Sequence, residues 1–202
     1  MEARVPRYGS MRASAILLFV LLETLRAELP EPLAEPVSVK DPSGADWIEI
    51  RIHKAVPVQK VDNSIRGADL PQIPQAAFLG TIRYVKPGGD FCGKPIPPGV
   101  YTMRYWLLPE DGAHQGVAPR RDSVLLSAIE AERDNEARPS YEQLVDMSRK
   151  ASGTTHPAVL FLTVPEPGAG FPSVRQQGRW RVVQVKSGEV ELGIVVAGKA
   201  EE

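Results

Sequence analysis

The chain has 202 residues, of which 43% are hydrophobic, and 24 lysines and arginines against 25 acidic residues give a net charge of −1. This length and apolar content are sufficient for one domain with a substantial core. The balanced charge excludes the basic surface of a nucleic-acid-binding protein, so we expect no nucleic-acid partner. Cys92 is the only cysteine, which excludes an intramolecular disulfide.

The N-terminus has the pattern of a signal peptide. An apolar run at residues 13–22, too short to span a bilayer, follows three basic residues, Arg4, Arg7 and Arg12. The small residue Ala27 predicts a cleavage point, so we assign residues 1–27 to the signal peptide, with Met11 as an alternative start. An uncleaved membrane anchor is the alternative interpretation. We therefore expect an exported protein, periplasmic or extracellular, with no membrane span after cleavage.

Recurring prolines at residues 28–36 predict an extended linker, which leaves residues 37–202 as a single domain. Residues 47–53 alternate strictly, with Ile48, Ile50 and Ile52 on one face, as in a half-buried strand. The same type of pattern between turn signals predicts further strands at residues 78–85, 100–108, 123–127, 158–164, 179–185 and 190–196.

Two local signals refine this prediction. Gly188, within residues 186–189, predicts a hairpin between the last two strands. Ser140 followed by Gln143 is typical of a helix start, and Gly153 predicts the end of that helix. Many short strands with a single helix favour an all-β fold, namely an antiparallel β-sandwich with one short helix in a crossover.

The aromatic residues of the strand at residues 100–108 have two interpretations. Alternation places Tyr101 and Tyr105 on one side and Trp106 with Arg104 on the other, so at least one set is expected in the core. The alternative is an exposed platform, lined by Tyr101, Tyr105 and Trp106 with Arg104, that binds a sugar or a peptide.

A polar loop between two predicted strands supplies the other candidate ligand-binding residues: Asp111, His114, Arg120, Arg121 and Asp122. Hydrogen bonds that brace the loop are the alternative role for these side chains. His114 and Asp111, joined by His156 if the crossover returns to the same end of the fold, could bind a divalent metal ion. Otherwise the sequence predicts no cofactor.

Motifs for phosphate, dinucleotide, zinc-helix or esterase chemistry are absent from the sequence. A hydrolytic site would need Ser123 or Ser152 as nucleophile, His114 or His156 as base, and Asp111 or Asp122 to orient the base. Such a site requires a three-body geometry that spacing alone does not predict.

Residues Lys94 to Tyr105, with Pro97-Pro98-Gly99 leading into a strand, resemble the proline-glycine-x-tyrosine strand entry of secreted bacterial domains of the DUF2911 type. Together with residues Asp111 to Asp122, the chain is similar to uncharacterised exported proteins of planctomycetes and acidobacteria. The resemblance implies a signal peptide and a β-sandwich, and it implies no activity.

Three functional hypotheses follow from the sequence. The first is a non-enzymatic binding or accessory domain of the cell envelope, which presents the polar loop to a small molecule or an envelope component. The second is a metal-dependent or hydrolytic enzyme that uses His114 with nearby carboxylates. The third is a purely structural envelope protein.

Overall fold

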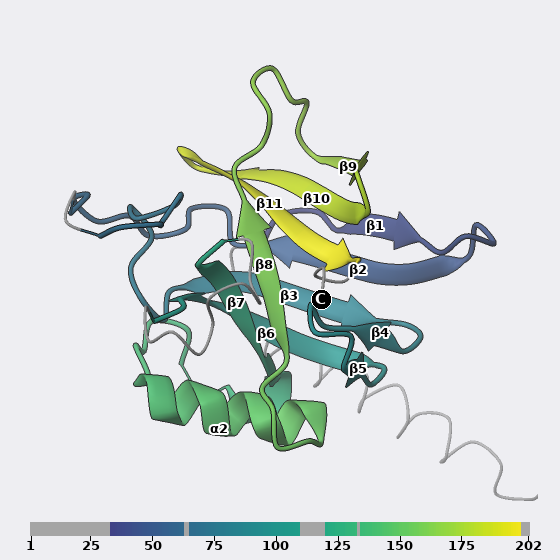
Figure 1. The fold of residues 1–202 in the computed structure, drawn as a ribbon, viewed down its shortest axis with the longest axis horizontal. Coiled ribbons are helices and arrows are strands. Elements are labelled where there is room, and N and C mark those ends of the chain that lie inside the picture. The colour runs from purple at the N-terminus through teal and green to yellow at the C-terminus, as the bar shows by residue number, and fades with distance from the viewer. Residues whose placement is uncertain (1–32, 63–64, 110–119, 133, 199–202) are drawn as a thin grey trace, which may run out of the picture. The chain divides into compact units, whose positions relative to one another are not determined.

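The computed structural model of the protein describes residues 33–62, 65–109, 120–132 and 134–198. Their elements, in chain order, are β1 (Val37–Lys40), β2 (Asp46–Ile52), β3 (Phe78–Tyr84), β4 (Gly88–Gly89), β5 (Pro95–Ile96), β6 (Gly99–Leu107), β7 (Asp122–Ala128), a 3-10 turn η1 (Ile129–Ala131), α2 (Tyr141–Ser152), β8 (Val159–Thr163), β9 (Ser173–Gln177), β10 (Trp180–Ser187) and β11 (Val190–Ala197). Figure 1 shows their arrangement.

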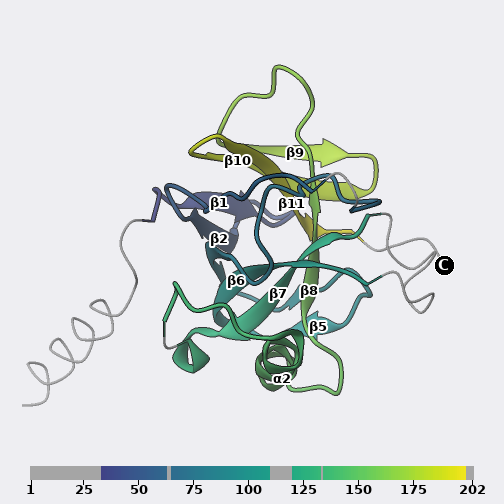
Figure 2. The same cartoon turned by 90° about the vertical axis from the view of Figure 1, so that its left-hand side faces the viewer.

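Nine strands of the described residues form one antiparallel sheet, in the order β1-β2-β3-β6-β7-β8-β11-β10-β9. The sheet curls until it is nearly closed into a barrel, so that its two halves face each other across a shared core, as the sheets of a sandwich do (Figures 1 and 2). Strands β4 and β5 form a separate two-stranded hairpin. The predicted all-β class is confirmed, as is the short helix, α2, in the crossover from β7 to β8.

Each strand predicted from the sequence is present, and two local signals act as expected. The hairpin of β10 and β11 turns at Gly188, whose φ of 57° favours glycine. Helix α2 begins with a complete capping box between Ser140 and Gln143 and ends at Gly153 in the left-handed conformation. Strands β1, β4, β5 and β9 were not predicted.

The predicted linker needs a correction at its described end. Leu33 forms an antiparallel bridge with His53, and the N–H of Ala34 donates to the carbonyl of Ile52 at 2.7 Å. These residues therefore extend the pairing of β1 with β2, because the backbone here finds partners at the end of β2. The domain begins before Val37.

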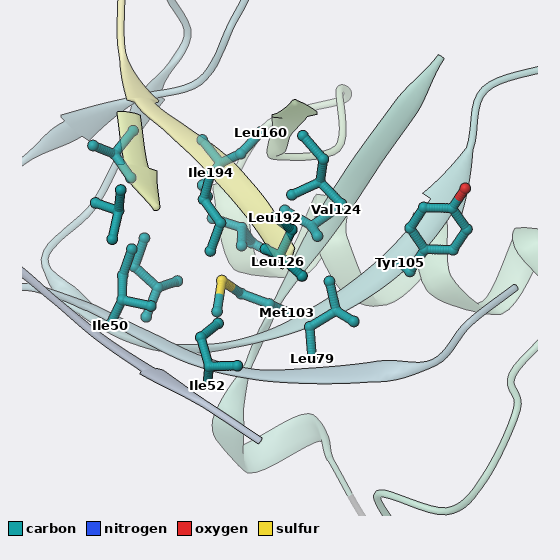
Figure 3. Packing of buried hydrophobic residues seen from close by; sticks show 14 of the residues in the cluster. Ile50, Ile52, Leu79, Met103, Tyr105, Val124, Leu126, Leu160, Leu192 and Ile194 are labelled. Atoms are coloured by element: carbon teal, nitrogen blue, oxygen red, sulfur yellow. The ribbon is translucent and has the colours of Figure 1, made fainter. Parts of the chain in front are cut away.

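The core lies inside the curled sheet. Figure 3 shows side chains from β2, β3, β6, β7, β8 and β11 pointing toward one another there, among them Ile50, Met103, Leu126, Leu160 and Ile194. In β2, β6, β7, β8 and β11 the core residues are every second one, as in a half-buried strand. In β3 the core residues Leu79 and Ile82 are three apart, because the register shifts near Gly80. Tyr101 and Tyr105 belong to this inner set and are 4% and 1% exposed.

Side chains bridge the opening of the curled sheet near β1 and β10, where no backbone ladder joins the described strands. Ser187 Oγ, at the end of β10, donates to the carbonyl of His53 and accepts the N–H of Val56 at 2.8 Å. The guanidinium of Arg181 donates to the carbonyl of Lys40 in β1. These contacts join β10 to β1 and to the segment after β2 across the remaining gap.

Two outer layers cover part of the sheet. Helix α2 lies against the outer face of β6 and β7, where Leu144 and Val145 pack with Leu125 (Figures 1 and 2). Phe91, from the loop of the β4–β5 hairpin, packs with Phe161 and with neighbouring apolar residues of β10 and β11. Both outer layers, helix α2 and the β4–β5 hairpin, therefore border the outer face of β8.

Arg104 of β6 also lies on the outer face, yet its side chain is fully buried. Its guanidinium donates two parallel hydrogen bonds to the carboxylate of Glu132, each 2.9 Å long. The remaining N–H groups donate to the carbonyls of Ala76, Ala137 and Asp134. A buried guanidinium with all five donors satisfied fixes the segment between η1 and α2.

The described residues contain no helix that is both long and apolar enough to cross a membrane.

Candidate functional site

A cavity of about 310 Å³ opens between the β4–β5 hairpin, the start of α2 and β8. We call it the Phe91 pocket. Its apolar lining is formed by Phe91, Leu108, Leu125, Pro157, Val159 and Phe161. The lining residues with polar groups are Asp90, Cys92, Lys94, Tyr141 and His156. Its volume is at the lower end of small-molecule sites.

Aromatic rings make up two walls of the pocket. The rings of Phe91 and Phe161 meet edge to face with centroids 3.9 Å apart. Tyr141, the first residue of α2, stacks on Trp106 of β6 at 4.9 Å. Both arrangements fix ring orientation, so these walls are formed before any ligand arrives.

The hairpin that carries Phe91 is held in place by backbone contacts. The N–H of Phe91 donates to the carbonyl of Val159 at 3.2 Å, which attaches the loop to the start of β8. Gly88 permits the approach of the hairpin to the sheet, because a Cβ there would lie 2.1 Å from the ring of Tyr84. The wall of the pocket therefore depends on a glycine outside it.

Asp90 is the buried charged group of the pocket wall, since only 6% of the residue is exposed, whereas Lys94 is exposed. Burial raises the pKa of its carboxyl, while the N–H groups of Lys94 and Cys92 and the charges of Lys94 and His156 oppose the rise. The Lys94 N–H donates to Asp90 Oδ1 at 2.7 Å. Asp90 forms no ion pair with a side chain of the described residues.

Cys92 and His156 line the same pocket but do not form a catalytic dyad. Burial, and next the charge of Asp90, raises the pKa of the Cys92 thiol, so the thiol stays protonated at neutral pH. No hydrogen bond joins Cys92 to His156 among the described residues. This shift is opposite to the lowered pKa by which cysteine nucleophiles are activated.

Two residues predicted to bind ligand, Asp122 and Tyr105, are instead bonded to each other inside the fold. Tyr105 Oη donates to Asp122 Oδ1 at 2.8 Å, and the same carboxylate accepts the N–H groups of Asp69 at 2.7 Å and Leu70 at 3.0 Å. Asp122 is 0% exposed. Burial, and next the nearby charge of Asp122, raises the pKa of Tyr105. This is the loop-bracing alternative.

The tyrosine platform is a second correction. Tyr101 Oη donates to the carbonyl of Pro97 at 2.8 Å, and its ring packs edge to face on Tyr84 inside the sheet. The exposed platform predicted for Tyr101 and Tyr105 is not formed, because alternation turns both rings inward. Trp106, on the outer face, contributes to the pocket only through its stacking on Tyr141.

Both predicted arginines take part in contacts within the protein. Arg120 forms an exposed ion pair with Asp69 at 2.8 Å. Arg121 donates from Nε to the carbonyl of Leu108 at 2.7 Å and from Nη1 to the carbonyl of Arg66. These bonds join the start of β7 to the segment before β3 and to the end of β6, and they do not point to a ligand.

The predicted metal and hydrolytic sites can be assessed only in part. Asp111 and His114 lie outside the described residues, and no group of three metal-ligating side chains occurs within them. His156 is exposed at the rim of the Phe91 pocket. Ser152 Oγ donates to the carbonyls of Arg149 and His156, while Ser123 Oγ donates to the carbonyl of Trp106. Neither hydroxyl contacts an imidazole nitrogen of the described residues.

A second cavity of about 330 Å³ lies at the gap between β1 and β10. Its apolar lining includes Val37, Ile52, Phe171 and Val185, and its polar side chains, Glu35 and Lys186, carry opposite charges. It lacks a buried charged group, which distinguishes it from the Phe91 pocket.

No family model matches the chain, and neither a curated protein nor a solved structure was found to be similar to it. The site is therefore described by its own geometry.

Proposed function

We propose that this chain is a non-enzymatic binding domain whose Phe91 pocket takes a small, largely apolar molecule. The observation that carries the proposal is a cavity of about 310 Å³ that combines apolar walls with a few polar groups. Concave sites of this composition are where proteins bind small molecules. The raised pKa of Cys92 argues against thiol chemistry at this site.

The volume limits the size of the ligand. A cavity of this size corresponds to roughly ten water molecules of liquid volume, so a ligand of about ten non-hydrogen atoms would fill it. One aromatic ring with a short chain has that size and would contact the rings of Phe91 and Phe161. Such contacts bury apolar area and add aromatic packing.

The test uses 3-phenylpropanol, a neutral probe of about ten non-hydrogen atoms, in a ligand-observed NMR titration of the purified protein. We expect saturable binding with a dissociation constant on the order of 1 mM, as expected for a ligand of this size. Val159→Trp places an indole in the pocket and should abolish binding. No saturable binding to the unmodified protein would overturn the proposal.

Val164→Trp is the matched control, because Val164 follows β8, is 52% exposed and does not line the pocket. It makes the same chemical change outside the cavity and should leave the titration unchanged. Circular dichroism of both variants verifies that each is folded. Equal loss of binding in both variants would contradict a site at the Phe91 pocket.

We further propose that the domain acts after export, as the basic residues and apolar run at the N-terminus predict. Fractionation of cells that express the full chain, with mass spectrometry of the N-terminus, tests this proposal. A protein that retains residue 1 in the cytosol would overturn it.

A further inference from the structure

The polar groups of the Phe91 pocket differ in how far they are removed from water. Asp90 is 6% exposed, whereas Lys94 and His156 are exposed at the rim. An exposed cation gains little from pairing with a ligand anion, because water solvates both charges well. A buried carboxylate has lost that solvation and gains much more from an opposite charge.

The carboxylate of Asp90 also lacks a charged partner. Its donors are the neutral N–H groups of Lys94 and Cys92, and no side chain of the described residues forms an ion pair with it. The rise in its pKa shows that the protein does not fully compensate the buried charge. A cationic group delivered by a ligand would supply what the fold does not.

The walls next to Asp90 suit a cation with an apolar body. Phe91 and Phe161 expose ring surface to the pocket, and Tyr141 adds a third ring. Aromatic faces attract an ammonium group and bury the carbon skeleton attached to it. An anionic ligand would instead meet the negative charge of Asp90 in a wall of low polarity.

We propose that the ligand of the Phe91 pocket is a small aromatic or aliphatic amine, whose ammonium group pairs with Asp90. The ammonium group donates to the carboxylate of Asp90, and the apolar body lies against Phe91 and Phe161. This inference rests on the proposed function and adds the charge of the ligand to it.

The experiment compares three probes with the same phenylpropyl body: 3-phenylpropylamine, 3-phenylpropanol and 3-phenylpropanoate. Each is titrated against the purified protein at neutral pH by ligand-observed NMR. We expect the amine to bind roughly ten- to a hundredfold tighter than the alcohol, as for a charge-assisted hydrogen bond, and the carboxylate to bind weakest. Equal affinities, or tightest binding of the carboxylate, would overturn the proposal while the pocket itself stands.

Asp90→Asn tests whether Asp90 is responsible for the preference. This substitution keeps an oxygen for the Lys94 N–H and removes the charge, so the ratio of amine to alcohol affinity should fall to near one. Asp146→Asn is the matched control, because it removes a charge from an exposed position on α2. It should leave the ratio unchanged.

The outcomes separate the two proposals. A ratio that persists in Asp90→Asn would overturn the assignment to Asp90, and the comparison of the three probes in the unmodified protein does not depend on the folding of any variant. Failure of all three probes to bind would overturn the proposed function together with this inference.

Discussion

Replacing Asp122 by alanine tests whether this residue braces the fold. The carboxylate accepts hydrogen bonds from Tyr105 Oη, Asp69 N and Leu70 N, and it is 0% exposed. With alanine at this position, the O–H of Tyr105 and the N–H groups of Asp69 and Leu70 would lose their hydrogen-bond acceptor in the space that these groups enclose. The effect should therefore appear in the free energy of unfolding.

The magnitude follows from the number of donors. A buried donor left unpaired costs about 1–3 kcal/mol. The N–H of Asp69 is only half-buried, so water can replace part of its bond, and we expect Asp122→Ala to lower the free energy of unfolding by about 3–6 kcal/mol. A domain of this size loses about 2–4 °C of melting temperature per kcal/mol, which predicts a drop of roughly 6–24 °C.

Urea denaturation followed by circular dichroism measures this loss. Tyr105→Phe is the graded comparison, because it removes one of the three bonds and leaves the other two. We expect it to cost about 1.5–3 kcal/mol, the value for a bond to a charged group. A loss below about 1 kcal/mol for Asp122→Ala, or equal losses for both variants, would refute the bracing role.

Three further predictions concern other parts of the structure. Glu132→Gln should lower the free energy of unfolding by about 3 kcal/mol in urea denaturation, because it leaves the buried Arg104 without its charged partner; an unchanged midpoint would contradict this. Gly88→Ala should cost about 1–3 kcal/mol by overpacking against Tyr84, with a lower melting temperature as the measurement. Burial raises the pKa of the Asp90 carboxyl, so the ionised carboxylate lowers the stability of the fold at pH values above that pKa. The stability gained by Asp90→Asn should therefore be largest at neutral pH and should shrink as the pH falls. A gain independent of pH would refute this prediction.

The sequence predicted the elements that have a strong local signal. Ile48, Ile50 and Ile52 alternate because one face of β2 enters the core, and the capping box at Ser140 satisfies the first N–H groups of α2 locally. Strand β9 carries no such signal, because it is an edge strand with no fully buried residue. Its pairing with β10 depends on the rest of the sheet.

The site was harder to predict than the fold. The sequence indicates Asp122 and Tyr105 as candidate ligand-binding residues by their type, but residue type does not show whether a side chain faces solvent or the core. The register between β6 and β7 decides this orientation. Asp122 of β7 lies directly opposite Leu107 of the neighbouring strand β6, so its carboxylate points inward toward Tyr105.

The Phe91 pocket was not predicted because its walls come from segments far apart in the sequence. Asp90 and Cys92 lie within a glycine-rich turn, which at the sequence level indicates only a change of direction. Tyr141 and Phe161 reach the same cavity through the packing of α2 and β8. A charged residue next to an aromatic residue in the turn, Asp90-Phe91, was the one available signal.

The incomplete closure of the sheet has a consequence for contacts between molecules. Strands β1 and β9 are edges, and edge strands can pair with those of another copy and start aggregation. Here β1 has four residues with a register shift at Lys40, and β9 presents Arg175 and Gln176 to solvent. Short, irregular and charged edges oppose continuous pairing, so we expect the domain to resist edge-to-edge aggregation although the sheet is open.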